Sequence, residues 1–130
     1  MESELIHRWI HSASDEIPRL RDCNDWPWGV VANCEELLRV FVAALGPDYD
    51  VNEQVAIHAN ATVEEGAVLK GPVVVCDGAL VAAQTYLRGG VYIGPRSSIG
   101  PGCELKSSLL FQDSVIAHLG FVGDQLSVRA

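Results

Sequence analysis

Large apolar residues recur at every sixth position through the second half of the chain. Counted in sixes, ten successive positions are large and apolar, and these are Ile57, Val63, Leu69, Val75, Val81, Leu87, Ile93, Ile99, Leu105 and Phe111. The count continues to Ala117 and fails at Gly123. A period of six is neither the period of an α-helix nor the simple alternation of a strand.

A six-residue period is typical of a triangular coil, in which each unit is a short strand followed by a corner. Three units close one coil, with the repeated apolar residue pointing into the core. A series of hairpins is the alternative, but hairpins would not keep one phase over so many units. The pattern therefore predicts a mainly β domain over residues 51–130, a short parallel β-helix of about four coils between Ile57 and Val128.

The first half of the chain has helical spacing instead. Apolar residues at Leu5, Ile6, Trp9, Ile10, Ala13 and Ile17 predict a helix that stops at Pro18. A second helix begins after Asn33, with Glu36 positioned for a capping box, and ends at Gly46–Pro47. Its expected apolar face is Leu37, Leu38, Phe41, Ala44 and Leu45. We expect residues 1–50 to form a helical cap on the β-helix, because solenoids need covered ends.

Composition narrows the classes of function. The net charge of −8 argues against nucleic acid or an anionic membrane as the main partner. No apolar run is long enough to span a bilayer, and the N-terminus does not resemble a signal peptide, so a cytoplasmic protein is expected. The four cysteines form no C-x-x-C pair, and we interpret them as reduced, buried residues rather than nucleophiles.

Basic residues recur at the coil spacing. Lys70, Arg88 and Lys106 are separated from one another by one coil length each, just after the repeated apolar position, and Asp124 continues the series. Residues one coil length apart should stack at the strand spacing, where like charges repel by about 1 kcal/mol per pair even in water. Two interpretations stay open: a binding site for a phosphate or diphosphate, and a solvated edge compensated by acidic neighbours such as Glu104.

His118 lies two repeat units after Lys106, which places it on another corner of the triangle. The residues expected below it are Glu64, Ala82 and Gly100, and the small ones leave room for a ligand or a neighbouring subunit. A histidine suits general-base chemistry near neutral pH, but a surface or packing role is the more common use.

The repeat resembles the left-handed β-helix of hexapeptide acyltransferases. More narrowly, "ELKSSLLFQDSVIAHLGFVGD" and "YLRGG" resemble the acetyltransferase domain of bifunctional N-acetylglucosamine-1-phosphate uridyltransferase/glucosamine-1-phosphate acetyltransferases. This resemblance implies that Arg88 and Lys106 hold the phosphate and sugar, that Lys70 and Asp124 are neighbours of the site, and that His118 is the general base toward acetyl-CoA. It also implies a homotrimer with clefts between subunits, and no metal.

The sequence departs from that family in two respects. Phe121 replaces the substrate-binding tyrosine, and the later coils that supply much of the acetyl-CoA site are absent from this sequence. "WPWGVVANCEELL" is similar to the segment that joins a nucleotidyltransferase domain to its β-helical tail, yet no Gly-rich "G-x-G-T-R" loop is present. We therefore do not expect this chain to synthesise sugar nucleotides by itself.

Two main hypotheses follow. The first is an N-acetyltransferase that acts on an amino-sugar phosphate with acetyl-CoA. The second is a non-catalytic module that binds a sugar nucleotide or assembles a partner. A metal-dependent hydrolase of the β-helical carbonic anhydrase type needs three histidines around zinc. It is disfavoured because only His58 and His118 lie in the repeats, in different columns.

Overall fold

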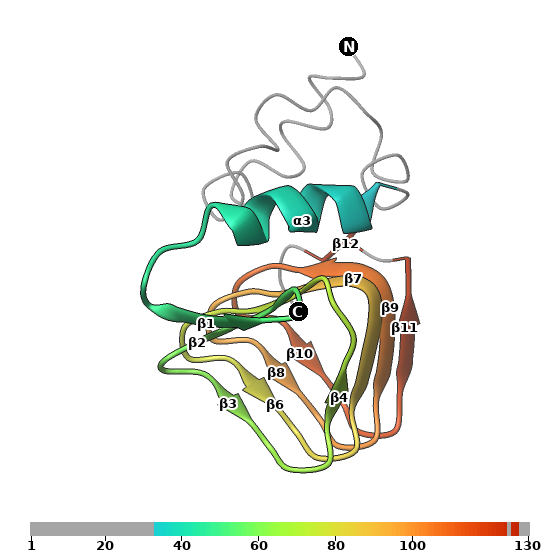
Figure 1. The fold of residues 1–130 in the computed structure, drawn as a ribbon. Coiled ribbons are helices and arrows are strands. Elements are labelled where there is room, and N and C mark those ends of the chain that lie inside the picture. Colours follow the sequence, from blue (N-terminus) through green and yellow to red (C-terminus); the bar gives the residue numbers. More distant parts are fainter. Residues whose placement is uncertain (1–32, 125, 128–130) are drawn as a thin grey trace.

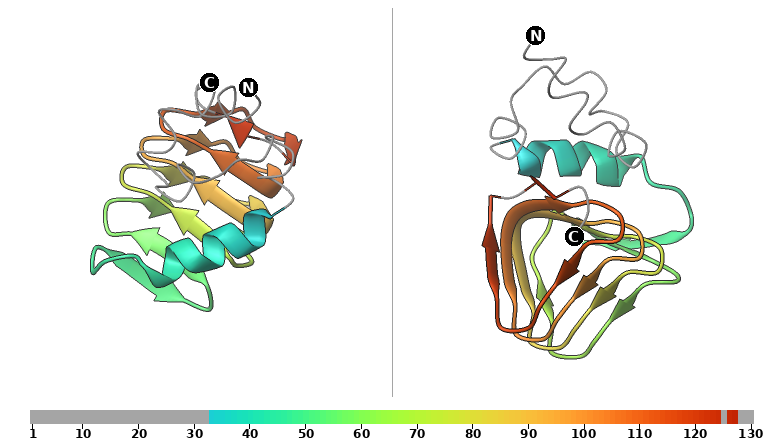
Figure 2. Two further views of the ribbon diagram at one scale, coloured as in Figure 1. Left: turned by 90° about the horizontal axis from the view of Figure 1, so that it is seen from above. Right: turned by 180° about the vertical axis from the view of Figure 1, so that it is seen from behind.

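The computed structural model describes residues 33–124 and 126–127. Within that part, one α-helix lies against a triangular stack of parallel coils (Figure 1). The views from above and from behind show the coils stacked one on the next with the helix along one side (Figure 2). The helix predicted over residues 1–17 lies outside the described residues.

The helix is α3 (Cys34–Ala43). The strands are short, and they are β1 (Tyr49–Asn52), β2 (Val55–His58), β3 (Thr62–Val63), β4 (Val68–Leu69), β5 (Val73–Val75), β6 (Leu80–Val81), β7 (Tyr86–Ile93), β8 (Ser98–Ile99), β9 (Glu104–Leu110), β10 (Val115–Ile116), β11 (Phe121–Gly123) and β12 (Leu126–Ser127).

Among the described strands, all pairs except one are parallel. β1 pairs with β2 in the antiparallel direction at the N-terminal end of the stack, and every other pairing between these strands joins one coil to the next. One sheet runs β10-β8-β6-β3, and the longer strands β7 and β9 bend round a corner to form two sides of the triangle. The predicted short left-handed parallel β-helix of about four coils is confirmed, and one helix, α3, packs along its side.

The coil has three outer faces. The third face is the outer side of β3, β6, β8 and β10. The basic face is the outer side of β4, the first halves of β7 and β9, and β11. The helix face is the outer side of β2, β5 and the second halves of β7 and β9, where α3 packs.

The interior is filled by the repeated apolar residues. Val75, Val81, Leu87, Ile93, Ile99 and Leu105 are all fully buried and belong to one cluster. Burying a branched aliphatic side chain stabilises the folded state by about 1.5–3 kcal/mol. The interior columns of such residues therefore supply most of the driving force for stacking the coils.

At one corner, the third coil is one residue shorter than the second coil. Arg88 pairs with Lys106, whereas Val91 pairs with Ser108, so the offset between register partners falls by one. At this corner the second coil has two glycines, Gly89 and Gly90, both with positive φ, where the third coil has only Ser107. The Ser107 hydroxyl donates to the Gly89 carbonyl at 2.8 Å, which ties the unequal corners together.

This change of register corrects three sequence-based expectations. The interior residue after Leu105 is Leu110, the register partner of Ile93, while the expected Phe111 packs outside the coil in the cluster under α3. Gly123, not Asp124, is the register partner of Lys106.

The third correction concerns the column of His118. Because Ile116 pairs with Ile99, it is Ala117 that follows above Gly100, and His118 lies one residue further along, toward Pro101. The expected column of Glu64, Ala82 and Gly100 below His118 is therefore wrong by one residue.

Helix α3 covers the helix face. Its buried residues Cys34, Leu38 and Val42 contact the outward residues of the underlying strands, including Val74, Tyr92 and Leu109. Asn33 is the N-cap position as expected, but its side chain makes no capping hydrogen bond, so the predicted capping box does not form. The expected apolar residue Ala44 is exposed, and Val42 takes its place because it faces the sheet.

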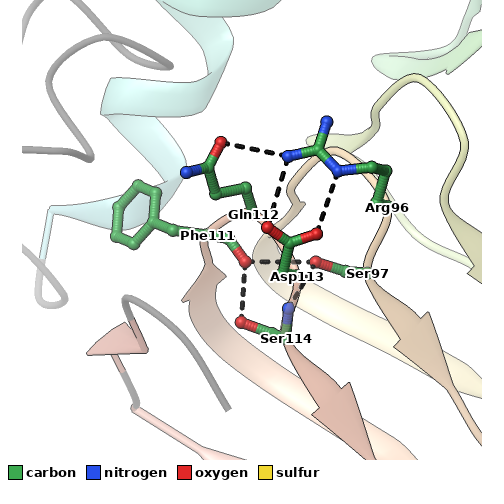
Figure 3. Close-up of polar contacts among 6 residues, drawn as sticks. All are labelled: Arg96, Ser97, Phe111, Gln112, Asp113 and Ser114. Atoms are coloured by element: carbon green, nitrogen blue, oxygen red, sulfur yellow. Dashed lines mark hydrogen bonds and ion pairs between the residues drawn. The ribbon is translucent and has the colours of Figure 1, made fainter.

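Side chains close the corner between the helix face and the third face (Figure 3). The Ser97 and Ser114 hydroxyls both donate to the Phe111 carbonyl, at 3.1 and 2.7 Å. Outside them, the Arg96 guanidinium binds both carboxylate oxygens of Asp113, at 2.9 and 3.2 Å. This bidentate pair joins two successive coils, and we interpret its role as structural.

Candidate functional site

The basic residues predicted as a column do lie in register on the basic face. Arg88 and Lys106 are direct register partners, and the Lys70 backbone N–H donates to the carbonyl of Leu87, one residue before Arg88. Alternation along the strands points these side chains outward, because the intervening Leu87 and Leu105 are fully buried. The fold thus brings three cations onto one face in successive coils.

Each of the three basic side chains extends toward a different neighbouring side chain, so their charged groups point away from one another. The Arg88 Nε donates to Glu104 Oε2 at 3.0 Å, and the Lys106 ammonium lies 4.0 Å from Asp124 Oδ1. Lys70 lies over the Tyr86 ring, with its Nζ 5.8 Å from the ring centroid. The compensation by Glu104 that one interpretation expected is therefore present.

The two ion pairs leave donors available. The side chains of Arg88 and Lys106 are 40% and 41% exposed. Among the described residues, no acceptor other than Glu104 contacts the Arg88 guanidinium, and the 4.0 Å distance at Lys106 is longer than a hydrogen bond. Exposed pairs of this kind contribute only about 0–1 kcal/mol, so an incoming anion can displace them.

His118 lies at the corner between the third face and the basic face. It is exposed, and within the described part of the chain no side chain hydrogen bonds to its imidazole. A Cβ built on Gly100 would lie 2.8 Å from the His118 backbone nitrogen. The room that a small residue was expected to leave for a ligand is therefore filled by the backbone of His118 itself.

His118 and the cations lie at opposite ends of the basic face. The register partner of Lys106 is Gly123, which follows His118 by five positions along the chain. At about 3.3 Å per residue their backbones are at most about 16 Å apart, and they are closer than this because the chain turns at His118 and Leu119 before β11. One chain therefore presents the base and the anion-binding residues on one face without closing them around a small substrate.

Phe121 lies between those ends. Its side chain is 64% exposed, and a Cβ built on Gly123 would lie 3.0 Å from the ring atoms Cε2 and Cζ. The ring therefore leans along β11 over Gly123, toward the column of Lys106. Exposed apolar side chains flank His118 too, since Leu119 is 79% and Val115 61% exposed.

The remaining ionisable groups do not add to this site. Cys34, Cys76 and Cys103 are buried, and burial raises the pKa of the Cys34 thiol to about 12. Burial also raises the pKa of Tyr49, whose phenol hydrogen bonds to Cys76 on a different corner. Across residues 33–124, no three His, Cys, Asp or Glu side chains are grouped to hold a metal ion.

The sequence analysis proposed Lys70, Arg88, Lys106, His118, Phe121 and Asp124 as site residues, and it mentioned Glu104 only as a neighbour. It did not single out Tyr86 or Leu119. The signal for Tyr86 was its spacing of one coil length from Val68 and Glu104, which are its register partners. Leu119 had no such signal, because its exposure depends on a corner with positive φ.

Comparison with known proteins supports the repeat. The family described as bacterial transferase hexapeptide (six repeats) matches residues 72–107. These residues include Arg88 and Lys106 but not Lys70, His118, Phe121 or Asp124. A search of curated proteins gives no match. In the described part of the chain, no helix has the length and apolar character needed to cross a membrane.

The matched repeat lies in the second and third coils, where each six-residue unit supplies one strand and one corner. The repeat in the sequence and the parallel coils in the structure indicate the same fold. Residues 72–107 are therefore similar to the bacterial transferase hexapeptide repeat, and the described part of the chain folds as a parallel β-helix.

Proposed function

We propose that this protein is an acyltransferase that moves the acetyl group of acetyl-CoA to the amine of an amino-sugar phosphate. The observation that carries the proposal is the exposed His118 imidazole, without a partner among the described residues, at the end of the face that carries Arg88 and Lys106. An imidazole of this kind is suited to deprotonating the amine of a substrate whose phosphate binds the cations further along the same face.

The proposed reaction needs only groups of this kind. His118 accepts a proton from the substrate amine as the nitrogen attacks the thioester carbonyl. The resulting tetrahedral intermediate collapses, the C–S bond breaks, and CoA leaves as a thiol with the proton returned by the imidazolium. Arg88 and Lys106 hold the phosphate through charge-assisted hydrogen bonds.

The position of His118 at a corner, with the cations at the other end of the basic face, is the reason to propose a homotrimer. A second copy packed against the corner at Leu119 would cover exposed apolar surface and narrow the space between His118 and the cations. The same packing would supply walls for the acetyl-CoA cleft. In this proposal, the site is complete only in the assembly.

A second candidate is a non-catalytic sugar-nucleotide-binding or assembly module. The ion pairs Arg88–Glu104 and Lys106–Asp124 favour it, because they compensate the two cations in the absence of a substrate. In a module of this type, His118 would be a surface residue and the basic face would bind weakly or contact a partner.

Ligand-induced thermal stabilisation distinguishes the two candidates. The ligands are acetyl-CoA, glucosamine 1-phosphate, UDP-N-acetylglucosamine and inorganic phosphate, each tested with the wild-type chain and Arg88→Gln. A ligand at about 100 times its Kd stabilises the folded state by about 2.7 kcal/mol, which raises Tm by roughly 5 °C or more. Arg39→Gln is the matched control, because Arg39 lies on α3 and pairs only with Glu35 among the described residues.

An acyltransferase is stabilised by both acetyl-CoA and the amino-sugar phosphate, and Arg88→Gln loses the second effect while Arg39→Gln keeps it. Stabilisation by UDP-N-acetylglucosamine alone supports the binding module. If none of the four ligands changes Tm, the basic face is a solvated edge and the proposed function is wrong.

A further inference from the structure

β1 is the outermost strand of its sheet. It pairs only with β2, after which the sheet continues through β5, β7 and β9. The Ala59 N–H donates to the Asp48 carbonyl at 2.9 Å, which identifies these opposite residues as a hydrogen-bonded pair. Because hydrogen-bonded and non-hydrogen-bonded pairs alternate along an antiparallel ladder, the Val51–Ala56 pair is not hydrogen-bonded. The N–H and C=O of Val51 therefore point away from β2, toward the open edge.

Nothing in the described part of the chain pairs with this edge. Asp50, Val51 and Asn52 are exposed. The Tyr49 N–H turns back to the Gly46 carbonyl at 3.3 Å, but no hydrogen bond among the described residues uses the outward N–H or C=O of Val51. An exposed edge strand with unpaired backbone donors and acceptors is a template for a further strand.

The two sides of β1 differ in chemistry. Tyr49 packs against the apolar cluster under α3, and Val51 lies on the same side, opposite Ala56. Asp50 lies on the other side, opposite Ile57. A strand added at the edge would place one residue beside Val51 and the two residues that flank it on the side of Asp50. The fitting pattern is therefore an apolar residue between two residues that complement a carboxylate.

The surroundings of this edge are acidic. Residues 46–66 contain no lysine or arginine and five exposed acidic residues, which are Asp48, Asp50, Glu53, Glu64 and Glu65. The ion pairs of the described residues involve none of these five. Charged residues on an edge strand discourage pairing with a strand of the same charge, and a second copy of β1 would bring two such acidic groups together. The charge favours a basic strand instead.

We propose that the open edge of β1 binds an extended basic segment of a partner protein, which adds to the sheet as a further strand. An apolar side chain of that segment lies beside Val51, and lysine or arginine side chains on either side of it lie near Asp50. The inference goes beyond the proposed function and does not depend on acyl transfer, because β1 lies at the opposite end of the stack from His118.

Fluorescence anisotropy with the full chain tests this inference with three labelled peptides. The first is Ser-Thr-Lys-Val-Lys-Thr-Ser, which has the fitting pattern in a single register. The second has proline in place of the valine, so it keeps the charge but loses the central N–H. The third has glutamate in place of both lysines. The first should bind at least about five-fold more tightly than the second, and the third should not bind.

Val51→Pro removes the outward N–H of β1 without removing a bond to β2, and edge strands accept proline at such positions. It should weaken the valine peptide at least about five-fold, while Val51→Ile, the matched control, should change its affinity by less than about two-fold. Circular dichroism checks that both variants fold.

Asp50→Asn should weaken the valine peptide about three-fold at low salt and reduce the salt dependence of its binding. Glu36→Gln is the matched control, because Glu36 is an exposed acidic residue in the first turn of α3 rather than at the edge of β1. It should leave both the affinity and its salt dependence unchanged.

Equal binding of the valine and proline peptides would show attraction by charge alone and overturn the inference. The absence of binding, or an unchanged affinity in a folded Val51→Pro variant, would overturn it too. If Val51→Pro lowers the mass of the protein without peptide in light scattering, the edge pairs with a second copy and the inference is wrong. None of these outcomes bears on acetyl transfer, so failure of this inference is distinguishable from failure of the proposed function.

Discussion

Gly90 shows how single residues set the position of the helix on this β-helix. Its φ is +89°, and a Cβ built on it would lie 3.0 Å from the Glu35 backbone nitrogen and 3.1 Å from the Glu35 Cα. The Cys34 thiol also donates to the Gly90 carbonyl at 3.1 Å. The first turn of α3 can approach the corner this closely only because position 90 has no side chain.

Gly90→Ala should therefore lower the free energy of unfolding by about 1–3 kcal/mol, from backbone strain and the clash with α3. Urea unfolding monitored by circular dichroism measures this. Gly46→Ala is the control, because nothing lies within 4 Å of a Cβ at Gly46, and it should change stability by less than about 0.5 kcal/mol. Equal effects of the two substitutions would contradict the close approach at Gly90.

The buried Cys34 thiol makes the free energy of unfolding depend on pH in the alkaline range. Burial raises the pKa of its thiol from 9.0 to about 12, so between these values the folded state keeps a proton that the unfolded state has lost. Its contribution is complete below pH 9 and is lost as pH rises toward 12, with a slope of at most about 1.4 kcal/mol per pH unit.

Cys34→Ala should remove this part of the decline, so the difference in unfolding free energy between wild type and variant should shrink from pH 8.5 to 10.5. Urea titrations at intervals of half a pH unit measure it. A difference that stays constant over this range would show that the thiol is not protected in the folded state.

At the scale of elements, α3 and the β-helix form one packed unit. Leu38 is fully buried between the helix and the outward residues of β5, β7 and β9, which include Val74, Tyr92 and Leu109. The Phe41 and Tyr92 rings meet edge to face, with centroids 5.8 Å apart. Two aromatic rings at this distance and a buried leucine indicate a core of its own outside the coil.

Leu38→Ala should lower the free energy of unfolding by about 2–5 kcal/mol, because it leaves a cavity between two elements. Val40→Ala, on the same helix but 37% exposed, should have an effect below about 1 kcal/mol. Chemical denaturation of both variants provides the comparison. A small effect at Leu38 would mean that α3 does not pack on the helix face in solution.

The six-residue pattern was sufficient to predict that coils form, but it could not predict the exact number of residues in each coil. The six-residue count identifies the interior residues through Leu105, since each coil must place large apolar side chains inside. It fails at Leu109, Leu110 and Phe111, because three successive apolar residues satisfy the count in more than one register. Only the packing of Leu109 and Phe111 under α3 decides between them.

The change of register also explains why spacing predicted only part of the arrangement of the candidate site residues. Arg88 and Lys106 precede the change of register, so their stacking could be predicted from spacing alone. His118 and Asp124 follow it and are displaced by one residue. The ion pairs could not be predicted from spacing, because they run diagonally between columns, as from Arg88 to Glu104.

At the scale of the whole molecule, exposed apolar side chains on the last described coil support the proposed assembly. Leu119, Phe121 and Val115 are the most exposed large apolar residues in the described part of the chain, and all three lie on this coil. With one chain of 14.0 kDa, the proposed homotrimer has a mass of about three times that value. Exposed apolar side chains gathered in this way usually mark an interface.

Light scattering coupled to size exclusion should therefore give a trimer for the wild type and a smaller species for Leu119→Asp, which would place a charge in the interface. Val51→Asp is the control, since Val51 is also exposed at 45% but lies in β1 at the other end of the stack. A monomeric wild type would contradict the proposed assembly.

An assay of acetyl transfer decides whether this protein is the proposed acyltransferase. Purified protein is incubated with acetyl-CoA and glucosamine 1-phosphate, and mass spectrometry follows the N-acetylated product for the wild type, His118→Asn and His58→Asn. We expect steady turnover by the wild type, a loss of kcat of about 100-fold or more in His118→Asn, and retained turnover in His58→Asn. No product from the wild type, or full activity in His118→Asn, would contradict the proposed function.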